Sequence, residues 1–353
     1  MERPILNPML ADPEAPAPRA TPWRATATRL WLRNAGRMLW RILTYSPLRN
    51  GPLRIRIEDG TFWQRVLRGA MYRLTFVPLL VALSAVALVY SATHPPVPAP
   101  TMDPSAHHIY YDPVTLLSSD GVRLDGWLVP VIDAKTILAH KEQSLRARRP
   151  AVVLLHDHGR SRQQMLPLIQ PLHEAGFVVL AIDLRGRGGG VAPVGATYGL
   201  REANDVKAAV ELLRRRPYVD ATKIALVGIG TGGNAAILAA HADPTIAAVV
   251  AVNPIESPKQ VLTDHLGPKQ AWLSFINPLC RWTFELAYQA ELEDLNLRRY
   301  EKMMEARPVM VHRAGQINEL GAKHAELVTV FLDEKISATG ATAGLNAGDA
   351  SRR

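Results

Sequence analysis

The chain has 353 residues, of which 48% are hydrophobic and 21% charged, and this composition excludes a mini-protein or a wholly disordered chain. Its single cysteine, Cys280, excludes an intramolecular disulfide framework and any metal site built from several cysteines. The net charge of +9 is concentrated in residues 1–73, which hold thirteen Arg and five acidic residues, so the rest of the chain has a net charge of only +1. Because a nucleic-acid-binding domain needs positive charge on its folded surface, we expect no nucleic-acid partner.

Residues 1–73 are predicted to form a basic cytoplasmic segment. Within residues 29–43 an arginine recurs every four residues, and Trp and Leu cover the other faces of the implied helix. A basic amphipathic helix of this kind is typical of an anionic membrane surface, and packing against a partner protein is the alternative. Residues 1–22 are rich in Pro and Ala, and residues 336–353 in Ala, Gly, Thr and Ser, so we expect both ends to be disordered.

Residues 74–92 contain no charged side chain, and nineteen helical residues at about 1.5 Å each roughly span a bilayer's hydrocarbon layer. We therefore expect one transmembrane helix. Three arginines, Arg65, Arg68 and Arg73, lie before it, whereas the first charge after it is Asp103. This asymmetry predicts a cytoplasmic N-terminus and a periplasmic or extracellular C-terminal domain, joined to the helix by a Pro-rich linker at residues 93–107.

Residues 108–335 are predicted to fold as one α/β domain. Asp120-Gly121 is typical of a hairpin turn between two strands. After it, apolar strands at 151–156, 177–184, 223–229 and 246–252 alternate with helices at 163–175, 202–215 and 234–242. Repeated strand–helix–strand units indicate a mostly parallel sheet with helices on both faces.

Four segments in this order resemble the α/β-hydrolase superfamily, in particular its esterase, serine-aminopeptidase and prolyl-oligopeptidase-like branches: DGVRLDGWLVP, RPAVVLLHDHGRSR, GFVVLAIDLRGRG and TYGLREANDVKAAVELLRRRPYVDATKIALVGIGTGG. The resemblance covers about residues 108–255. It implies an α/β-hydrolase sheet, a nucleophile elbow and, at about residues 265–300, a small helical cap. Five aromatic residues of that cap could line a pocket, form its own core or contact a protein: Trp272, Phe275, Trp282, Phe284 and Tyr288.

The elbow departs from the family pattern. The family reads G-x-S-x-G, with the serine on a strained turn between a strand and a helix. Here the glycines Gly228, Gly232 and Gly233 are present, but Gly230 takes the serine position. Glycine tolerates the strained backbone, so the turn can persist without its nucleophile. Thr231 is a poor substitute, because shifting the frame places bulky Ile229 at a position that requires a small residue.

The region of the oxyanion hole is altered as well. Here the run after the strand is His156-Asp157-His158-Gly159, so an aspartate replaces the glycine of the family's His-Gly pair. A carboxylate beside a site that stabilises a developing oxyanion opposes the chemistry electrostatically. The backbone at His158 and Thr231 corresponds to the oxyanion hole. We expect structural roles for His156 and His158, and no metal or cofactor site.

The expected acid or base position of a catalytic triad also departs from the family pattern. Gln316 follows the strand 309–313; if that is the family's seventh strand, Gln316 replaces the acid, and if it is the eighth, the base. Glutamine does not titrate and can do neither task. Possible remnants are Glu256 and His324, although only seven residues separate His324 from Gln316. An acid and a histidine without the nucleophile do not make a triad.

These residues favour a catalytically inactive, membrane-anchored hydrolase-fold protein that acts as a scaffold or as a subunit with other membrane proteins. One alternative is an active esterase or peptidase with an atypical nucleophile. Another is a small-molecule or dinucleotide-binding domain, because Gly228-x-Gly230-x-x-Gly233 also fits the dinucleotide fingerprint, with Glu256 as its ribose-binding acid. A dinucleotide fingerprint normally lies at the start of its domain, whereas here two strands and a hairpin precede it, and this disfavours a dinucleotide-binding function.

Overall fold

The computed structural model describes residues 62–97, 100–131, 148–186, 194–313 and 325–336. It divides into two compact units, residues 1–77 and 78–353, which are described separately. Several predictions lie outside the described residues: the basic helix 29–43, the disordered ends 1–22 and 337–353, and the positions of Gln316 and His324.

Helix α2 (Phe62–Thr93) carries the apolar segment, and the boundary between the units falls within it, after Val77. In the described part of the chain one stretch, Arg73–Thr93, is long and apolar enough to cross a membrane by length and composition. Pro78 lies inside the helix rather than in its first turn, because the helix begins well before the apolar segment.

The seven described strands form one mixed sheet in the order β1-β2-β4-β3-β5-β6-β7. Their bounds are β1 (Asp112–Leu117), β2 (Arg123–Val129), β3 (Arg149–Leu155), β4 (Val178–Ile182), β5 (Val219–Ile229), β6 (Ala248–Val252) and β7 (Val309–His312). The hairpin β1–β2 and the pair β2–β4 are antiparallel, and all other neighbours are parallel. The predicted mostly parallel α/β sheet is confirmed.

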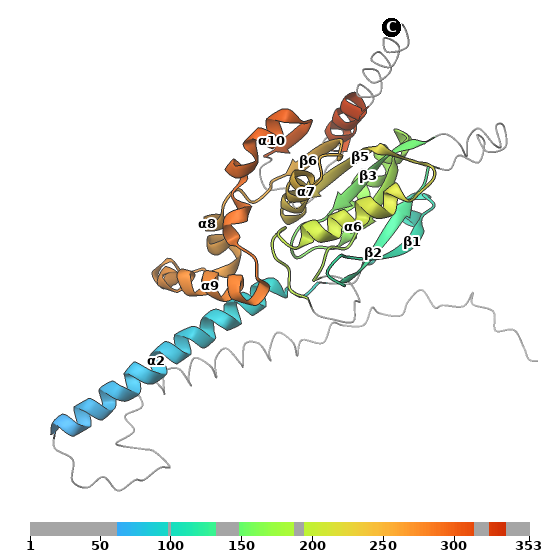
Figure 1. Ribbon diagram of the computed structural model, residues 1–353. Coiled ribbons are helices and arrows are strands. Elements are labelled where there is room, and N and C mark those ends of the chain that lie inside the picture. The colour runs from blue at the N-terminus through green and yellow to red at the C-terminus, as the bar shows by residue number, and fades with distance from the viewer. Residues whose placement is uncertain (1–61, 98–99, 132–147, 187–193, 314–324, 337–353) are drawn as a thin grey trace, which may run out of the picture. The chain divides into compact units, whose positions relative to one another are not determined.

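Helices cover both faces of this sheet (Figure 1). One face packs against α6 (Glu202–Arg214) and α7 (Thr231–Ala242), and the other against α5 (Leu166–Glu174) and the helical segment 325–336. The strands in the middle of the sheet are buried on both faces, which explains their continuous apolar runs. Helix α7 begins three residues earlier than the predicted start at Asn234, directly after Gly230.

A helical cap lies between β6 and β7 and is longer than the predicted 265–300. It comprises α8 (Pro258–Val261), a π-helical turn (Leu262–Leu266), a 3₁₀ helix (Ala271–Ile276), α9 (Asn277–Tyr288), two 3₁₀ turns (Leu292–Leu295 and Leu297–Tyr300) and α10 (Glu301–Ala306). The aromatic residues of the cap divide between two environments. Phe284 is fully buried in a core that the cap shares with the end of α2 and with Tyr198, and Tyr288 is partly buried against it, whereas Trp272, Phe275 and Trp282 are exposed.

The end of α2 packs directly on the folded domain. Ala85 and Val89 are buried in the core of the cap. The carbonyls of the last helical turn, which have no partner within the helix, accept hydrogen bonds from the domain: Ala196 N–H reaches Thr93 O at 2.9 Å, and the Tyr198 hydroxyl reaches Ala92 O at 3.2 Å. The helix therefore contacts the domain before the Pro-rich linker predicted at residues 93–107 ends, and the described part of that segment includes a 3₁₀ turn at Pro104–His107.

Candidate functional site: a hydrolase elbow filled by Asp157

The register of the sheet brings two loops together. Leu155 at the end of β3 lies opposite Gly228 near the end of β5, and Gly228 lies opposite Ala251 of β6 on its other side. The segments that follow β3 and β5 therefore leave the same edge of the sheet. This is the carboxyl edge of the parallel strands, where open α/β sheets usually bind ligands.

The elbow turn is intact. Gly230, at φ 51° and ψ −117°, joins β5 directly to α7. Two flanking glycines allow strand and helix to touch. A Cβ on Gly228 would overlap the backbone of Gly232, and a Cβ on Gly232 would lie 2.5 Å from Leu155 O. These glycines are required by packing in the folded chain, whether or not the site is active.

The variant Gly232→Ala is expected to lower the free energy of unfolding by about 3 kcal/mol, because its methyl group meets rigid backbone on β3. Gly233→Ala is the matched control in the same helical turn. Its Cβ would lie 3.2 Å from Gly228 O, a tight contact that a shift of a few tenths of an ångström relieves, and the higher helix propensity of alanine, up to about 1 kcal/mol, offsets that cost. Urea unfolding of both full-length variants measures the difference. Equal stabilities would contradict this account of the elbow.

The side chain of Asp157 occupies the space in which a nucleophile would lie. A Cβ built on Gly230 would overlap the carboxylate of Asp157, with Oδ1 as the nearest atom. No side chain of any size can be added at residue 230 while Asp157 keeps this position. The sequence predicted an unfavourable charge near the site, but not that this charge fills it.

One oxygen of this carboxylate takes both backbone donors of the expected oxyanion hole. Thr231 N–H donates to Asp157 Oδ1 at 3.0 Å, and His158 N–H donates to the same oxygen at 2.7 Å. The first donor is at the N-terminus of α7, where the helix dipole favours an anion. Burial raises the pKa of the Asp157 carboxyl group, and the two hydrogen bonds oppose that rise.

Three rings lie together near this carboxylate. Their centroids are 4.9 Å apart for His158 and Tyr198, 5.1 Å for Tyr198 and His265, and 5.6 Å for His158 and His265. Burial lowers the pKa of His265, whereas the charge of Asp157 raises it. Tyr198 is fully buried and has φ 59°, a conformation that is rare for a bulky side chain.

His156 is bonded within the fold rather than directed to a ligand. Its Nε2 accepts the Leu184 N–H at 3.0 Å, which makes Nδ1 the protonated nitrogen that donates to Asp157 O at 2.8 Å. This neutral tautomer ties the loop after β3 to the loop after β4. The geometry agrees with the structural role that we expected.

The remaining candidates do not gather at the elbow. Glu256 is half exposed and forms an ion pair with Arg313 at the end of β7. Strand β7 is the seventh of the described strands and pairs with β6, so it takes the place of the family's seventh strand, after which the acid is expected at Gln316. Gln316 and His324 themselves lie outside the described residues.

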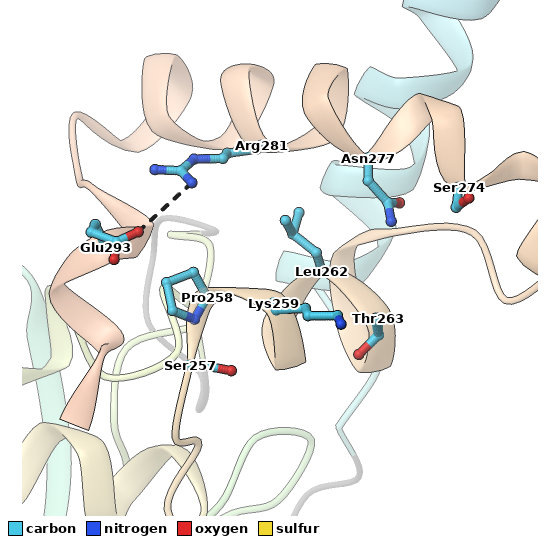
Figure 2. Close-up of a pocket in the computed structure, with 9 residues that line it drawn as sticks. All are labelled: Ser257, Pro258, Lys259, Leu262, Thr263, Ser274, Asn277, Arg281 and Glu293. Carbon is cyan, nitrogen blue, oxygen red and sulfur yellow. Dashed lines mark ion pairs between the residues drawn. The ribbon is translucent and has the colours of Figure 1, made fainter. Parts of the chain in front are cut away.

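A hollow of about 460 Å³ lies within the cap (Figure 2). It is lined from α8 and the π-helical turn on one side and from α9 on the other, and none of its lining residues belongs to the elbow. Arg281 reaches across one end toward Glu293, at 3.8 Å. Over the residues that the structure describes, no group of three His, Cys, Asp or Glu side chains could hold a metal ion.

Sequence reasoning identified the elbow glycines, Asp157 and the two oxyanion-hole residues, and the structure brings them together. It missed Tyr198 and His265. Tyr198 lies within the resembling region, in the loop before α6, but no role was expected for it, and His265 lies in the cap, beyond that region. No pattern of spacing links them to the elbow, since only the folded chain places their rings side by side.

A sequence profile described as the alpha/beta hydrolase family matches residues 152–332. Among curated proteins, polyketide transferase grgF of Penicillium sp. is 29% identical over 144 residues, 40% of this chain and 44% of that protein. An uncharacterized protein of Mycobacterium tuberculosis is 30% identical over 180 residues, 50% of this chain and 56% of that one. The chain thus matches about half the length of these relatives.

Among solved structures, the Pyrococcus furiosus esterase Pf2001 has 20% identity and a TM-score of 0.49, and covers 69% of this chain and 99% of its own. The crystal structure of the α/β hydrolase GrgF from Penicillium sp. has 17% identity and a TM-score of 0.47, and covers 65% of this chain and 100% of its own.

Proposed function

Because the chain belongs to the α/β-hydrolase family, we propose that it is a membrane-anchored member with an inactive hydrolase site, and that its folded domain acts as a scaffold or subunit of a membrane complex. The observation that carries this proposal is the position of Asp157. Its carboxylate takes the place of the nucleophile at Gly230 and accepts both N–H groups of the oxyanion hole.

Two energetic effects of Asp157 oppose acyl transfer at this site. Removing one oxyanion-hole donor typically costs about 3 kcal/mol of transition-state stabilisation, and here both donors are engaged by Asp157. A second negative charge about 4 Å away adds repulsion of about 4 kcal/mol at an effective dielectric constant of about 20. Protonation of Asp157 would relieve the repulsion, but the side chain would still fill the site.

The anchor is supported by the apolar stretch Arg73–Thr93 and by the arginines on its N-terminal side. By the positive-inside rule the N-terminus lies in the cytoplasm and the folded domain lies on the other side, in a periplasm or outside the cell. The basic helix 29–43 would then lie on the inner membrane surface or contact another subunit.

We expect the full-length protein, in membranes, to show no labelling by a fluorophosphonate probe and no turnover of short-chain nitrophenyl esters. The matched variant Asp157→Gly, which opens the oxyanion hole but adds no nucleophile, should be equally silent. Labelling of the wild-type chain would overturn the proposal, and mapping the modified residue would then favour an active hydrolase with an atypical nucleophile.

The dinucleotide alternative meets an obstacle at the same place. In that fingerprint a pyrophosphate binds at the helix N-terminus, through backbone N–H groups. At the start of α7 the Thr231 N–H is bonded to Asp157, so a pyrophosphate would face a carboxylate. The ribose-binding candidate Glu256 is paired with Arg313 instead. Both observations disfavour a dinucleotide at this elbow.

A further inference from the structure

Helix α9 of the cap has an apolar stripe on its outer side. Leu279, Trp282 and Leu286 follow one another on α9 at intervals of three and four residues, and Phe275, on the 3₁₀ helix before it, continues this spacing. Leu279 is half buried and packs against the core of the cap. Phe275, Trp282 and Leu286 are 64%, 61% and 64% exposed. On the 3₁₀ helix that precedes α9, Trp272 is 74% exposed. A folded domain surrounded by water rarely exposes such a group of large apolar side chains.

The opposite face of α9 lies in one core with the last turns of α2. Cys280 and Phe284 are fully buried in this core, which also contains Ala85 and Val89, and the Tyr288 hydroxyl donates to Thr93 Oγ1 at 2.8 Å. Helix α9 is therefore apolar on two faces, and one of them is already covered by the segment that we propose to be membrane-spanning.

The polar side chains of α9 lie between these two faces. Figure 2 shows Asn277 and Arg281 pointing from α9 into the hollow of the cap. Arg281 donates to Glu285 at 2.9 Å, so this pair carries no net charge. No charged residue interrupts the outer stripe between Phe275 and Leu286 on its own face.

The contacts with α2 fix the depth of α9 relative to the anchor. Between Val81 and Ala92 one side of α2 is buried or half buried against the cap, while its other side exposes Leu79, Leu83, Val86 and Tyr90. These contacts cover the half of Arg73–Thr93 that is nearer the folded domain, so α9 lies beside the anchor on that side of the bilayer. The apolar stripe of α9 is then continuous with the lipid-facing side of the anchor.

We propose that the 3₁₀ helix Ala271–Ile276 and α9 lie in the interface of the bilayer, with Trp272, Phe275, Trp282 and Leu286 in contact with lipid beside the anchor. Tryptophan is favoured at this depth, because its ring is apolar and its N–H reaches the headgroups. The occupant of the stripe is the lipid surface itself. This inference rests on the proposed membrane anchoring and adds a second, lateral attachment to it.

The test uses the full-length chain in vesicles of phosphatidylcholine and phosphatidylglycerol. A nitroxide label is placed at Leu286→Cys, at Leu83→Cys on the anchor, or at Lys207→Cys, an exposed position on α6. All three carry Cys280→Ala, which removes the single native thiol. We expect labels at 83 and 286 to collide several-fold more often with oxygen, which dissolves in lipid, than with a water-soluble nickel chelate, and the label at 207 to show the reverse.

A label at 83 in lipid together with a label at 286 in water would overturn the interfacial helix and leave the anchor intact. A label at 83 in water would overturn the anchor and this inference together. Spin–spin broadening at 286 would also overturn it, by indicating a second copy on the stripe. A second measurement needs no cysteine substitution: bromine-labelled lipid quenches the fluorescence of tryptophans that touch it. The quenched fraction should be clearly smaller in Trp272→Phe/Trp282→Phe than in the wild-type protein, and an unchanged fraction would contradict the proposal.

Discussion

The variant Gly230→Ser is expected to be less stable than the wild-type protein by about 3 kcal/mol and to remain unlabelled by a fluorophosphonate. The serine side chain would overlap the carboxylate of Asp157, and overpacking of this kind costs about 1–3 kcal/mol. A non-glycine residue at φ 51° and ψ −117° adds a further strain of about 1–3 kcal/mol. Absence of fluorophosphonate labelling in Gly230→Ser would therefore not show whether a catalytic base is present.

The informative variant is Gly230→Ser/Asp157→Gly, which removes the overlap and frees both N–H donors. We expect a favourable coupling of about 1–3 kcal/mol between the two substitutions in a double-mutant cycle. Gly230→Ser/Asp157→Asn is the matched control, because it removes the charge but keeps the volume, and it should show little recovery. Labelling of the glycine double variant would additionally report a working base. Wild-type stability in Gly230→Ser alone would contradict the overlap.

The second large effect is expected at Arg185, the largest fully buried side chain of the described residues. Its guanidinium donates to Asp205 at 2.6 Å, to Asp120 at 2.5 and 2.9 Å and to Ser118 at 3.3 Å, and so joins α6 to the β1–β2 hairpin. Arg185→Met leaves Asp205 buried without its partner, which typically costs about 3–5 kcal/mol. Arg214→Met, at a partly exposed pair with Asp243, is the control and should cost less than about 1 kcal/mol.

The loss should also depend on pH. Burial raises the pKa of the Asp205 carboxyl to about 6, and Arg185 lowers it. Without the arginine the pKa rises further, so the folded variant binds a proton that the unfolded chain releases above about pH 4. Its stability therefore falls as the pH increases, and the difference from wild type should be smaller at pH 4 than at pH 7. Urea unfolding at the two pH values measures this, and an equal difference at both would contradict it.

The parts of this molecule that follow local rules were predictable from sequence. The apolar runs of β3, β4, β5 and β6 and the hairpin at Asp120-Gly121 all occur as expected, because each depends on burial or on turn geometry within a few residues. The predicted start of α7 was wrong by three residues. Gly232 and Gly233 have low helix propensity, so the sequence does not indicate a first helical turn that tertiary contacts stabilise.

The candidate site was predictable only in composition. The missing serine and the added aspartate are visible in sequence, and so is the conflict of charge. The consequence that Asp157 reaches across to Thr231, 74 residues away, depends on the register of β3 and β5. The contact of α2 with the cap could not be predicted for the same reason. The sequence of an apolar helix does not show which of its sides contacts protein, and the partners of Ala85 and Val89 come from distant segments.

The overlap between residue 157 and residue 230 also makes these two positions depend on each other. A serine at 230 fits only if the carboxylate of Asp157 moves out of the turn, and this movement breaks its hydrogen bonds with His158 N–H and Thr231 N–H. Any group that displaces this carboxylate therefore frees the space beside Gly230 and both backbone donors at the same time.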